Sequence, residues 1–493
     1  MTHPNVSLPD RTCVTPRGTS ALCTFSWRTG SLLFLVLAVV IPILVAGGRT
    51  PEDLGSALAA VLAITVLSAA GLAWIYIHGK ANLMWLGFWM YCYLFLGLAA
   101  FTQIGRNQWP LPAAPRHDAV TTASLLGLIG CLVWLIVYGF VRRRGSTPPA
   151  HRLVGDRRRR VFVWGAIAIT VWFLATVGLG ILFTSRQQFG DYLTAAFGSQ
   201  TNATIAQSLG AVPIAVAFLA QLDNQRRGRS RLGLTLILLL LLNVIVSNVF
   251  TSPRTWVGTL VMSALLMVGK KPASTRKIRA LLVGWLVAFM VIFPQADIFR
   301  NELRRNVVKL SPADAFVTGD YDSFHQMAHG VAFVAQYGVQ WGNQFLGTIF
   351  FFVPRNIWPG KAEGTGVLLA QFAHLDFTNL SAPLWIEGYV DFGVVGTIAI
   401  MAAWGAVCAA LDRRFVAELQ RGYGVFVIGV PLLAFWQMII LRGSLMGVMP
   451  TVFAVLACLL FLGWRSKVSA PEGEPGETSV HEAQPATSTR SFP

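Results

Sequence analysis

Long apolar stretches alternate with short polar segments along most of this chain. The apolar stretches cover residues 31–47, 57–77, 83–104, 120–141, 161–183, 204–222, 232–250, 255–269, 280–296, 384–411, 424–441 and 443–463. Most are close to the length of about 20 residues with which an α-helix crosses a bilayer. The first stretch has no small-residue cleavage site after it, which favours a retained span over a signal peptide. The pattern predicts an all-α polytopic membrane protein with about twelve transmembrane helices.

Composition agrees with this class. Hydrophobic residues make up 54% of the 493 residues and charged residues only 12%, and the mean hydropathy is +0.58. A soluble domain of this size has too little interior to bury so many apolar side chains.

The basic residues predict the orientation of the spans. If the N-terminus is cytoplasmic, 27 of the 39 Lys and Arg but only 9 of the 22 Asp and Glu fall on the cytoplasmic side. This asymmetry is typical of membrane proteins and predicts that both termini are cytoplasmic. The net charge of +17 therefore reflects topology, since the arginine clusters face anionic lipid headgroups, and it does not indicate a nucleic-acid partner.

Three kinds of segment follow from this division. Residues 1–30 and 464–493 are rich in small and polar residues and are predicted to be disordered cytoplasmic tails. Residues 31–296 hold spans one to nine, and residues 384–463 hold spans ten to twelve. Between them lies a long extracytoplasmic loop, residues 297–383, in which we expect short helices. Loops of this length are usually functional.

The cysteines give no sign of a disulfide framework or a thiolate metal site. Cys13 and Cys23 fall in the N-terminal tail, and the other four cysteines fall in predicted spans. No predicted outside loop therefore carries a cysteine pair.

Basic residues of the long loop are candidates for binding phosphate. Arg300 and Arg304 are four residues apart on a helix predicted to continue beyond span nine, so they share a face. Two guanidinium groups one turn apart suit the two phosphates of a pyrophosphate. The alternative is that these arginines lie at a helix end and extend their charged groups to the membrane interface. Arg355 and Lys361 flank a turn bounded by prolines at the expected headgroup level. Arg254 lies in a tight outside turn between spans seven and eight and is a further candidate for binding phosphate. Arg442, at the turn between spans eleven and twelve, is either another such candidate or an interfacial anchor of its helix.

The apolar residues Asn343 to Phe352 precede Arg355 and are too few to cross the bilayer. Pro354 ends them, so we expect a re-entrant or surface helix. Trp341 and Trp358 fit interfacial anchors.

Acidic residues and histidines are candidates for acid–base chemistry. Glu387 and Asp391 share one helix face at the start of span ten, and two such carboxylates repel each other unless a cation neutralises them. The alternative to a catalytic role is a structural one, in which Glu387 and Asp391 form ion pairs with Arg355 or Lys361.

The stretch from Gly319 to Gly330 carries Asp320, Asp322, His325 and His329. It lacks the glutamate of a zinc-protease helix, so a metal is not expected. Asp322 instead fits a helix cap, and His325 fits an uncharged substrate contact.

The order of several motifs resembles the bacterial oligosaccharide repeat-unit polymerases, the Wzy-type O-antigen polymerases. The motifs are PR at 354–355, WPGK at 358–361, GTG at 364–366, FTNLS at 377–381 and E-x-x-x-DFG-x-x-G from Glu387, with GDYDSF at 319–324 and TSPR at 251–254 similar too. The resemblance covers residues 247–256 and 299–411 and is only compositional elsewhere.

This resemblance implies a GT-C-like glycosyltransferase of the bacterial plasma membrane, with its active site on the extracytoplasmic side. It would transfer a growing glycan from undecaprenyl pyrophosphate to an incoming lipid-linked oligosaccharide repeat unit, without a cofactor. Membrane lipids, a flippase and a chain-length regulator are the expected partners. The pyrophosphate-binding residues would be Arg254, Arg300, Arg304, Arg355 and Lys361.

The catalytic base expected from the same reasoning is Glu387, followed by Asp391 or His325. A glycan ligase with the same donor is the alternative activity. A transporter fits less well, because the charged residues gather at one predicted surface rather than at mid-membrane depth.

Overall fold

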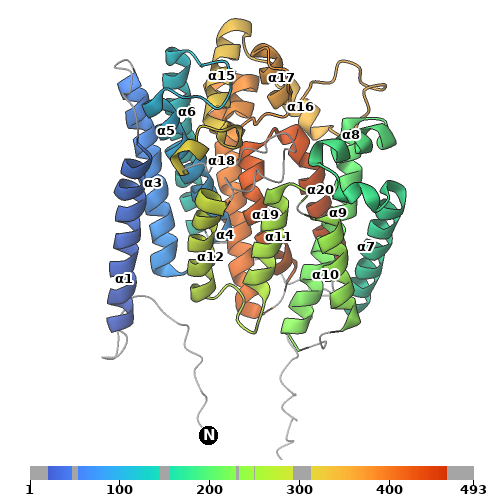
Figure 1. Cartoon of the computed structure of the whole chain (residues 1–493). Coiled ribbons are helices and arrows are strands. Elements are labelled where there is room, and N and C mark those ends of the chain that lie inside the picture. Colours follow the sequence, from blue (N-terminus) through green and yellow to red (C-terminus); the bar gives the residue numbers. More distant parts are fainter. Residues whose placement is uncertain are drawn as a thin grey trace, which may run out of the picture.

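The computed structural model (Figure 1) describes residues 20–46, 54–144, 155–228, 233–248, 250–292, 312–422 and 424–463. All named elements within these ranges are helices. The first helix, α1 (Ser20–Leu35), begins inside the predicted N-terminal tail. The predicted C-terminal tail and the remainder of the N-terminal one lie outside the described residues.

Nine helices of the described ranges are long and apolar enough to cross a membrane. They are Trp27–Val45 (α1, a π-helical turn and α2), Gly55–His78 (α3), Leu83–Arg106 (α4, a π-helical segment and α5), His117–Arg143 (α6), Asp156–Val177 (α7), Gln200–Arg226 (α9), Leu384–Arg421 (α18), Val425–Arg442 (α19) and Leu445–Gly463 (α20). The class of polytopic helical membrane protein is thereby confirmed.

Three shorter helices fall on the remaining predicted spans. They are α10 (Leu234–Val246), α11 (Arg254–Met267) and α12 (Thr275–Val287), which continues as a π-helix over Ala288–Ile292. They stand beside the long helices in Figure 1. Because they are short, the count of twelve spans stays a prediction.

Helices outside the predicted spans gather at one end of the bundle (Figure 1). They are α8 (Arg186–Phe197), α15 (Ser323–Tyr337), α16 (Asn343–Ile349) and α17 (Thr365–Phe372). We call this end the site end.

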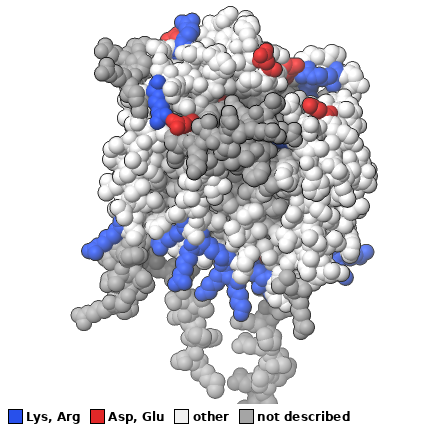
Figure 2. Space-filling view, in the orientation of Figure 1, with Lys and Arg blue, Asp and Glu red and all other residues white. Residues whose placement is uncertain are grey.

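Charged side chains divide between the two ends. Figure 2 shows Lys and Arg along the lower edge and both signs of charge at the top, and the described residues visible on this face between them are mostly uncharged. The lower edge is called the basic end, and a mostly uncharged surface between the two ends is what a bilayer core requires of the surface that faces it.

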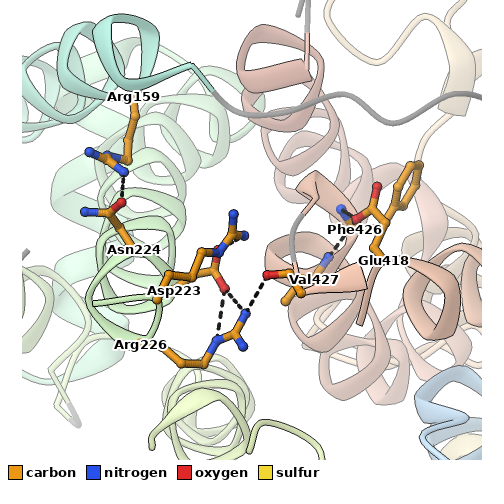
Figure 3. A network of polar contacts seen from close by, with 9 residues as sticks. Arg159, Asp223, Asn224, Arg226, Glu418, Phe426 and Val427 are labelled. Carbon is orange, nitrogen blue, oxygen red and sulfur yellow. Dashed lines mark hydrogen bonds and ion pairs between the residues drawn. The ribbon is translucent and has the colours of Figure 1, made fainter. Parts of the chain in front are cut away.

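Figure 3 shows how buried acids hold helices together at the basic end. Asp223 on α9 binds Arg226 at 2.6 Å, and Arg226 donates to the carbonyl of Gly422 after α18. Glu418 on α18 accepts hydrogen bonds from the backbone N–H groups of Phe426 and Val427 at the start of α19. These contacts tie α9, α18 and α19 to one another.

The helix α18 is broken near its start. Phe392 and Gly393 have non-helical backbone angles, and Gly393 has φ of 63°, which glycine adopts readily. The Thr397 hydroxyl donates to the carbonyl of Trp385 at 2.9 Å, although residues twelve apart in a continuous helix are about 18 Å apart. The short helix 384–391 therefore folds back on the longer one. The predicted single helix over 384–411 is wrong in this respect.

Glycines make room for this helical hairpin. A Cβ at Gly388 would lie 2.5 Å from the carbonyl oxygen of Gly396, and a Cβ at Gly130 would lie 2.0 Å from the indole nitrogen of Trp385. That indole also donates to the carbonyl of Gly127 on α6 at 3.2 Å. Close packing on α6 thus fixes the short helix that carries Glu387.

Candidate functional site

Two arginines from different helices meet one short segment at the site end. Arg254, the first residue of α11, lies 3.5 Å from Asp320, and Arg442, the last residue of α19, lies 2.8 Å from Asp322. Arg442 also donates to the carbonyl of Gly319 at 3.2 Å. The segment 319–322 therefore brings two guanidinium groups together that are 188 positions apart in the numbering.

Asp322 is buried, and its hydrogen-bond and ion-pair partners stabilise its carboxylate there. Besides Arg442, its carboxylate accepts a hydrogen bond from the backbone N–H of Ser381 at 3.1 Å. A buried carboxylate is stable only with such partners. Asp322 occupies the N-cap position of α15 but makes no capping hydrogen bond with its side chain, so the predicted capping role is wrong.

Glu387 lies on the other side of the turn between α19 and α20. Its carboxylate accepts hydrogen bonds from the Thr365 hydroxyl at 2.5 Å and from the backbone N–H of Leu445 at 2.8 Å. Leu445 is three positions after Arg442, which limits the distance between their Cα atoms to about 11 Å. The carboxylate and the two arginines therefore belong to one region.

The turn itself is fastened to the loop before α18. Ser381 forms an isolated antiparallel bridge with Gly443, and the N–H of Ala382 donates to the carbonyl of Arg442 at 3.0 Å. The loop, the turn and α15 thus enclose the site from three sides.

Buried polar groups without partners gather around the turn. Ser323 follows Asp322, Gln326 lies one helical turn further on α15, and Tyr91 lies beside Ser323 and Arg442. Polar atoms with no hydrogen-bond partner among the described residues occur on Tyr91, Ser323, Gln326, Ser381, Arg442 and Ser444. A buried polar atom that is left without a partner costs about 1–3 kcal/mol. The cluster is therefore suited to bind water or a hydroxylated ligand.

Arg355 and Lys361 lie together, but they differ in exposure. Arg355 is half exposed, donates to the carbonyl of Lys361 at 2.8 Å and lies 4.0 Å from Glu363. Lys361 is buried and donates to the carbonyls of Phe351 at 2.6 Å and Val353 at 3.0 Å. Burial, together with the charge of Arg355, lowers the pKa of the Lys361 ammonium group. Arg355 can reach a ligand, whereas Lys361 stabilises the backbone.

Asp391 has a different environment from Glu387. Its carboxylate accepts hydrogen bonds from the N–H groups of Gln344 at 3.1 Å and Phe345 at 2.8 Å, in the first turn of α16. A carboxylate is favoured at this end of a helix. The partners that the structure gives to the two carboxylates are thus hydroxyl and N–H groups, not the predicted Arg355 or Lys361.

His325 and His329 face one backbone carbonyl. Their Nε2 atoms lie 2.8 Å and 3.2 Å from the oxygen of Ala113. Since a carbonyl only accepts, each Nε2 carries the hydrogen and donates to it. Burial, with a smaller contribution from His329, lowers the pKa of His325 to about 3. That value is far from the pH at which a general base works best.

Arg300 and Arg304 lie outside the described residues. Thr365, Ser381, Tyr91, Ser323 and Gln326 were not predicted as site residues. Thr365 and Ser381 fall within the GTG and FTNLS motifs, which was the one sequence signal for them. Ser323 and Gln326 fall within the stretch 319–330 that the sequence singled out for its acids and histidines, whereas Tyr91, a single tyrosine in an apolar stretch, gave no signal.

No family model, curated protein or solved structure matches this chain. The resemblance to repeat-unit polymerases therefore stays a prediction.

Proposed function

We propose that this protein is a membrane glycosyltransferase that polymerises undecaprenyl-pyrophosphate-linked oligosaccharide repeat units into a surface polysaccharide. The observation that carries the proposal is that Arg254 and Arg442 approach one segment, and that Leu445, which follows Arg442 after the turn at 443–444, binds Glu387. The active site would face the extracytoplasmic side of the bacterial plasma membrane.

The arginines suit a pyrophosphate leaving group. Each guanidinium now pairs with a carboxylate, Asp320 or Asp322. Each guanidinium carries five N–H donors, so a pyrophosphate can bind, with the same bidentate geometry as a carboxylate, through donors that Asp320 and Asp322 do not use. Arg355, half exposed at the same end, would add a third positive charge for the carrier phosphates.

Glu387 suits the role of general base. A hydroxyl of the incoming sugar would attack the anomeric carbon of the growing chain, the bond from that carbon to the pyrophosphate oxygen would break, and Glu387 would take the hydroxyl proton. The electron pair of the broken bond leaves with undecaprenyl pyrophosphate. Thr365 would hold the carboxylate in place, and the hydroxyl and amide groups of Ser323 and Gln326 would bind sugar hydroxyls.

A reconstituted assay tests the proposal. Full-length protein in liposomes is supplied with synthetic pyrophosphate-linked repeat units, and the products are separated by length. Wild-type protein should give a ladder of longer lipid-linked chains, and Arg442→Ala and Glu387→Gln should lose most of it. Arg116→Ala is the matched control, because Arg116 forms an exposed ion pair with Asp118, and it should retain the ladder.

The other outcomes distinguish the alternatives. Extension that persists in folded Arg442→Ala and Glu387→Gln overturns the proposed site. Transfer of the glycan to a lipid core, with no ladder, indicates a ligase. Movement of the lipid-linked substrate without a new glycosidic bond indicates a transporter.

A further inference from the structure

The short helix α16 buries two of its polar residues and exposes its large apolar residues. Gln344 and Thr348 are buried, with 4% and 5% of their surface exposed. Phe345, Leu346 and Ile349 are each exposed by 44–46%. A helix on a protein surface in water has the reverse pattern. The arrangement is typical of a helix whose outer face meets hydrocarbon.

The exposed face continues beyond the helix. Large apolar residues on both sides of it are exposed too, namely Trp341, Phe350, Phe352 and Ile357. A contiguous apolar surface of this kind on a protein normally marks an interaction site.

This surface adjoins helices predicted to span the membrane. Gly347 of α16 packs on the Met446 side chain of α20, and the ring of Phe351 lies 6.1 Å from that of Phe453 on α20. Phe453 is itself 57% exposed, and Val395 on the neighbouring α18 is 73% exposed. Exposed apolar residues therefore occur on α16 and on both of the long helices that it contacts, α18 and α20.

The backbone of the segment is satisfied from within the protein. Asp391 accepts hydrogen bonds from two N–H groups in the first turn of α16, and Lys361 donates to the carbonyls of Phe351 and Val353 beyond its end. Water can satisfy such groups at an aqueous surface, but hydrocarbon cannot. Asp391 and Lys361 thus supply hydrogen bonds to backbone groups at the two ends of this segment. Such internal partners are necessary where the surroundings are hydrocarbon.

We infer that α16 and the residues up to Phe352 lie within the extracytoplasmic leaflet of the bilayer, with Phe345, Leu346 and Ile349 against lipid acyl chains. Part of the predicted extracytoplasmic loop 297–383 is then embedded in lipid. Trp341 would lie at the interface where the segment enters the hydrocarbon, and the half-exposed Arg355 would lie beyond the point where it leaves. The inference depends on packing and polarity alone and stands whether or not the protein transfers glycans.

Spin labels read the environment of this face directly. Single cysteines replace Phe345, Leu346 or Ile349 in full-length protein, with Cys13 and Cys23 changed to serine; the other native cysteines are buried. Each is labelled with a nitroxide in liposomes, and its collision rates with oxygen and with a water-soluble nickel chelate are measured. Gln371, exposed on α17, is the aqueous control position, and Leu456, exposed on α20, is the lipid control position.

The three α16 labels should behave like the label at Leu456, with oxygen collisions several-fold more frequent than nickel collisions. The label at Gln371 should show the opposite ratio. Labels on α16 that match the aqueous control overturn the inference. So does shielding from both reagents, because a second protein copy or a partner would then cover the face.

Discussion

Buried carboxylates have a recurrent use in this protein. Glu387, Asp391, Asp412 and Glu418 each accept hydrogen bonds from N–H groups at the first turn of another helix. Burial of an acid is therefore not by itself a sign of catalysis here. Asp412 binds a hydroxyl as well, that of Tyr138, so Glu387 differs by its place at the site end, beside the buried polar atoms around the turn that have no partner among the described residues.

The two carboxylates of the short helix should respond differently to neutral replacements. Asp391→Asn removes the charge that holds the α16 N-terminus, and we expect a loss of about 1–2 kcal/mol in the free energy of unfolding. Glu387→Gln should abolish glycan extension with a smaller loss of stability, because its amide oxygen can still accept from Leu445 and the Thr365 hydroxyl can accept from its amide NH2 group, whereas both partners of Asp391 only donate. Thermal unfolding in detergent and the extension assay measure the two effects. Equal stability losses in both variants would contradict the assigned roles.

His325 should make the fold sensitive to acid. Its pKa is about 3 in the folded protein and about 6.5 in the unfolded chain. Between these values the unfolded chain binds a proton that the folded protein does not, so stability falls as the pH drops below about 6.5 and stops falling near pH 3. At pH 5 the loss from this residue is about 2 kcal/mol.

The variant His325→Gln isolates this effect, since its amide can still donate to Ala113. Unfolding temperatures at about pH 7 and about pH 5 are compared for both proteins. The variant should lose less stability on acidification than the wild type. An identical loss would show that His325 is accessible to protons in the folded state.

At the level of single residues, the sequence predicted which residues carry charge but not what they contact. Arg254 and Glu387 were predicted and lie in the site. The i, i+4 spacing correctly placed Glu387 and Asp391 on one short helix, yet their partners come from α17, α20 and α16. Lys361 and Arg355 were treated alike, although one is buried and the other exposed. Such differences arise from packing between segments that are distant in the sequence. The spacing of residues along the chain gives no information about this packing.

At the level of elements, hydropathy predicted the spans well and the hairpin in α18 not at all. An apolar stretch looks the same whether it runs straight or turns back within the bilayer. The break rests on Gly393, and the close approach rests on Gly388 and Gly396. These glycines were the only feature of the sequence that could have indicated the hairpin. Glycine is also common in straight membrane helices, so they did not predict it.

Substitution of Gly393 tests the hairpin. Gly393→Ala places a side chain at φ of 63°, and we expect a cost of about 1–2 kcal/mol in stability. Gly388→Ala should be more damaging, because its Cβ would meet the Gly396 carbonyl at 2.5 Å. Gly165→Ala on α7 is the control: nothing lies within 4 Å of its Cβ position, so it should be neutral or slightly stabilising. Thermal unfolding compares the three, and a neutral Gly393→Ala would argue for a straight α18.

At the level of the whole molecule, charge and hydropathy predicted the class of fold and the separation of charges between its ends. They did not predict which helices meet. Arg254 and Arg442 are adjacent only because α11 and α19 pack together, with the ring of Trp256 5.3 Å from that of Trp436. The site is therefore a property of the assembled bundle.

A ligand that bridges the two arginines should stabilise that bundle. At a concentration 100 times its dissociation constant, a ligand that binds only the folded state adds about 2.7 kcal/mol. We expect undecaprenyl pyrophosphate, and more weakly inorganic pyrophosphate, to raise the unfolding temperature of the wild-type protein. Arg254→Gln and Arg442→Gln should each remove most of this shift, because one remaining guanidinium cannot hold both phosphates.

Arg116→Gln is the matched control for this measurement, since it removes one positive charge from the same end without touching the site. It should retain the full shift. If Arg116→Gln reduces the shift as much as Arg442→Gln does, pyrophosphate responds to the overall charge of this end. The ion pairs of Arg254 and Arg442 would then serve only to fasten the segment 319–322 to α11 and α19.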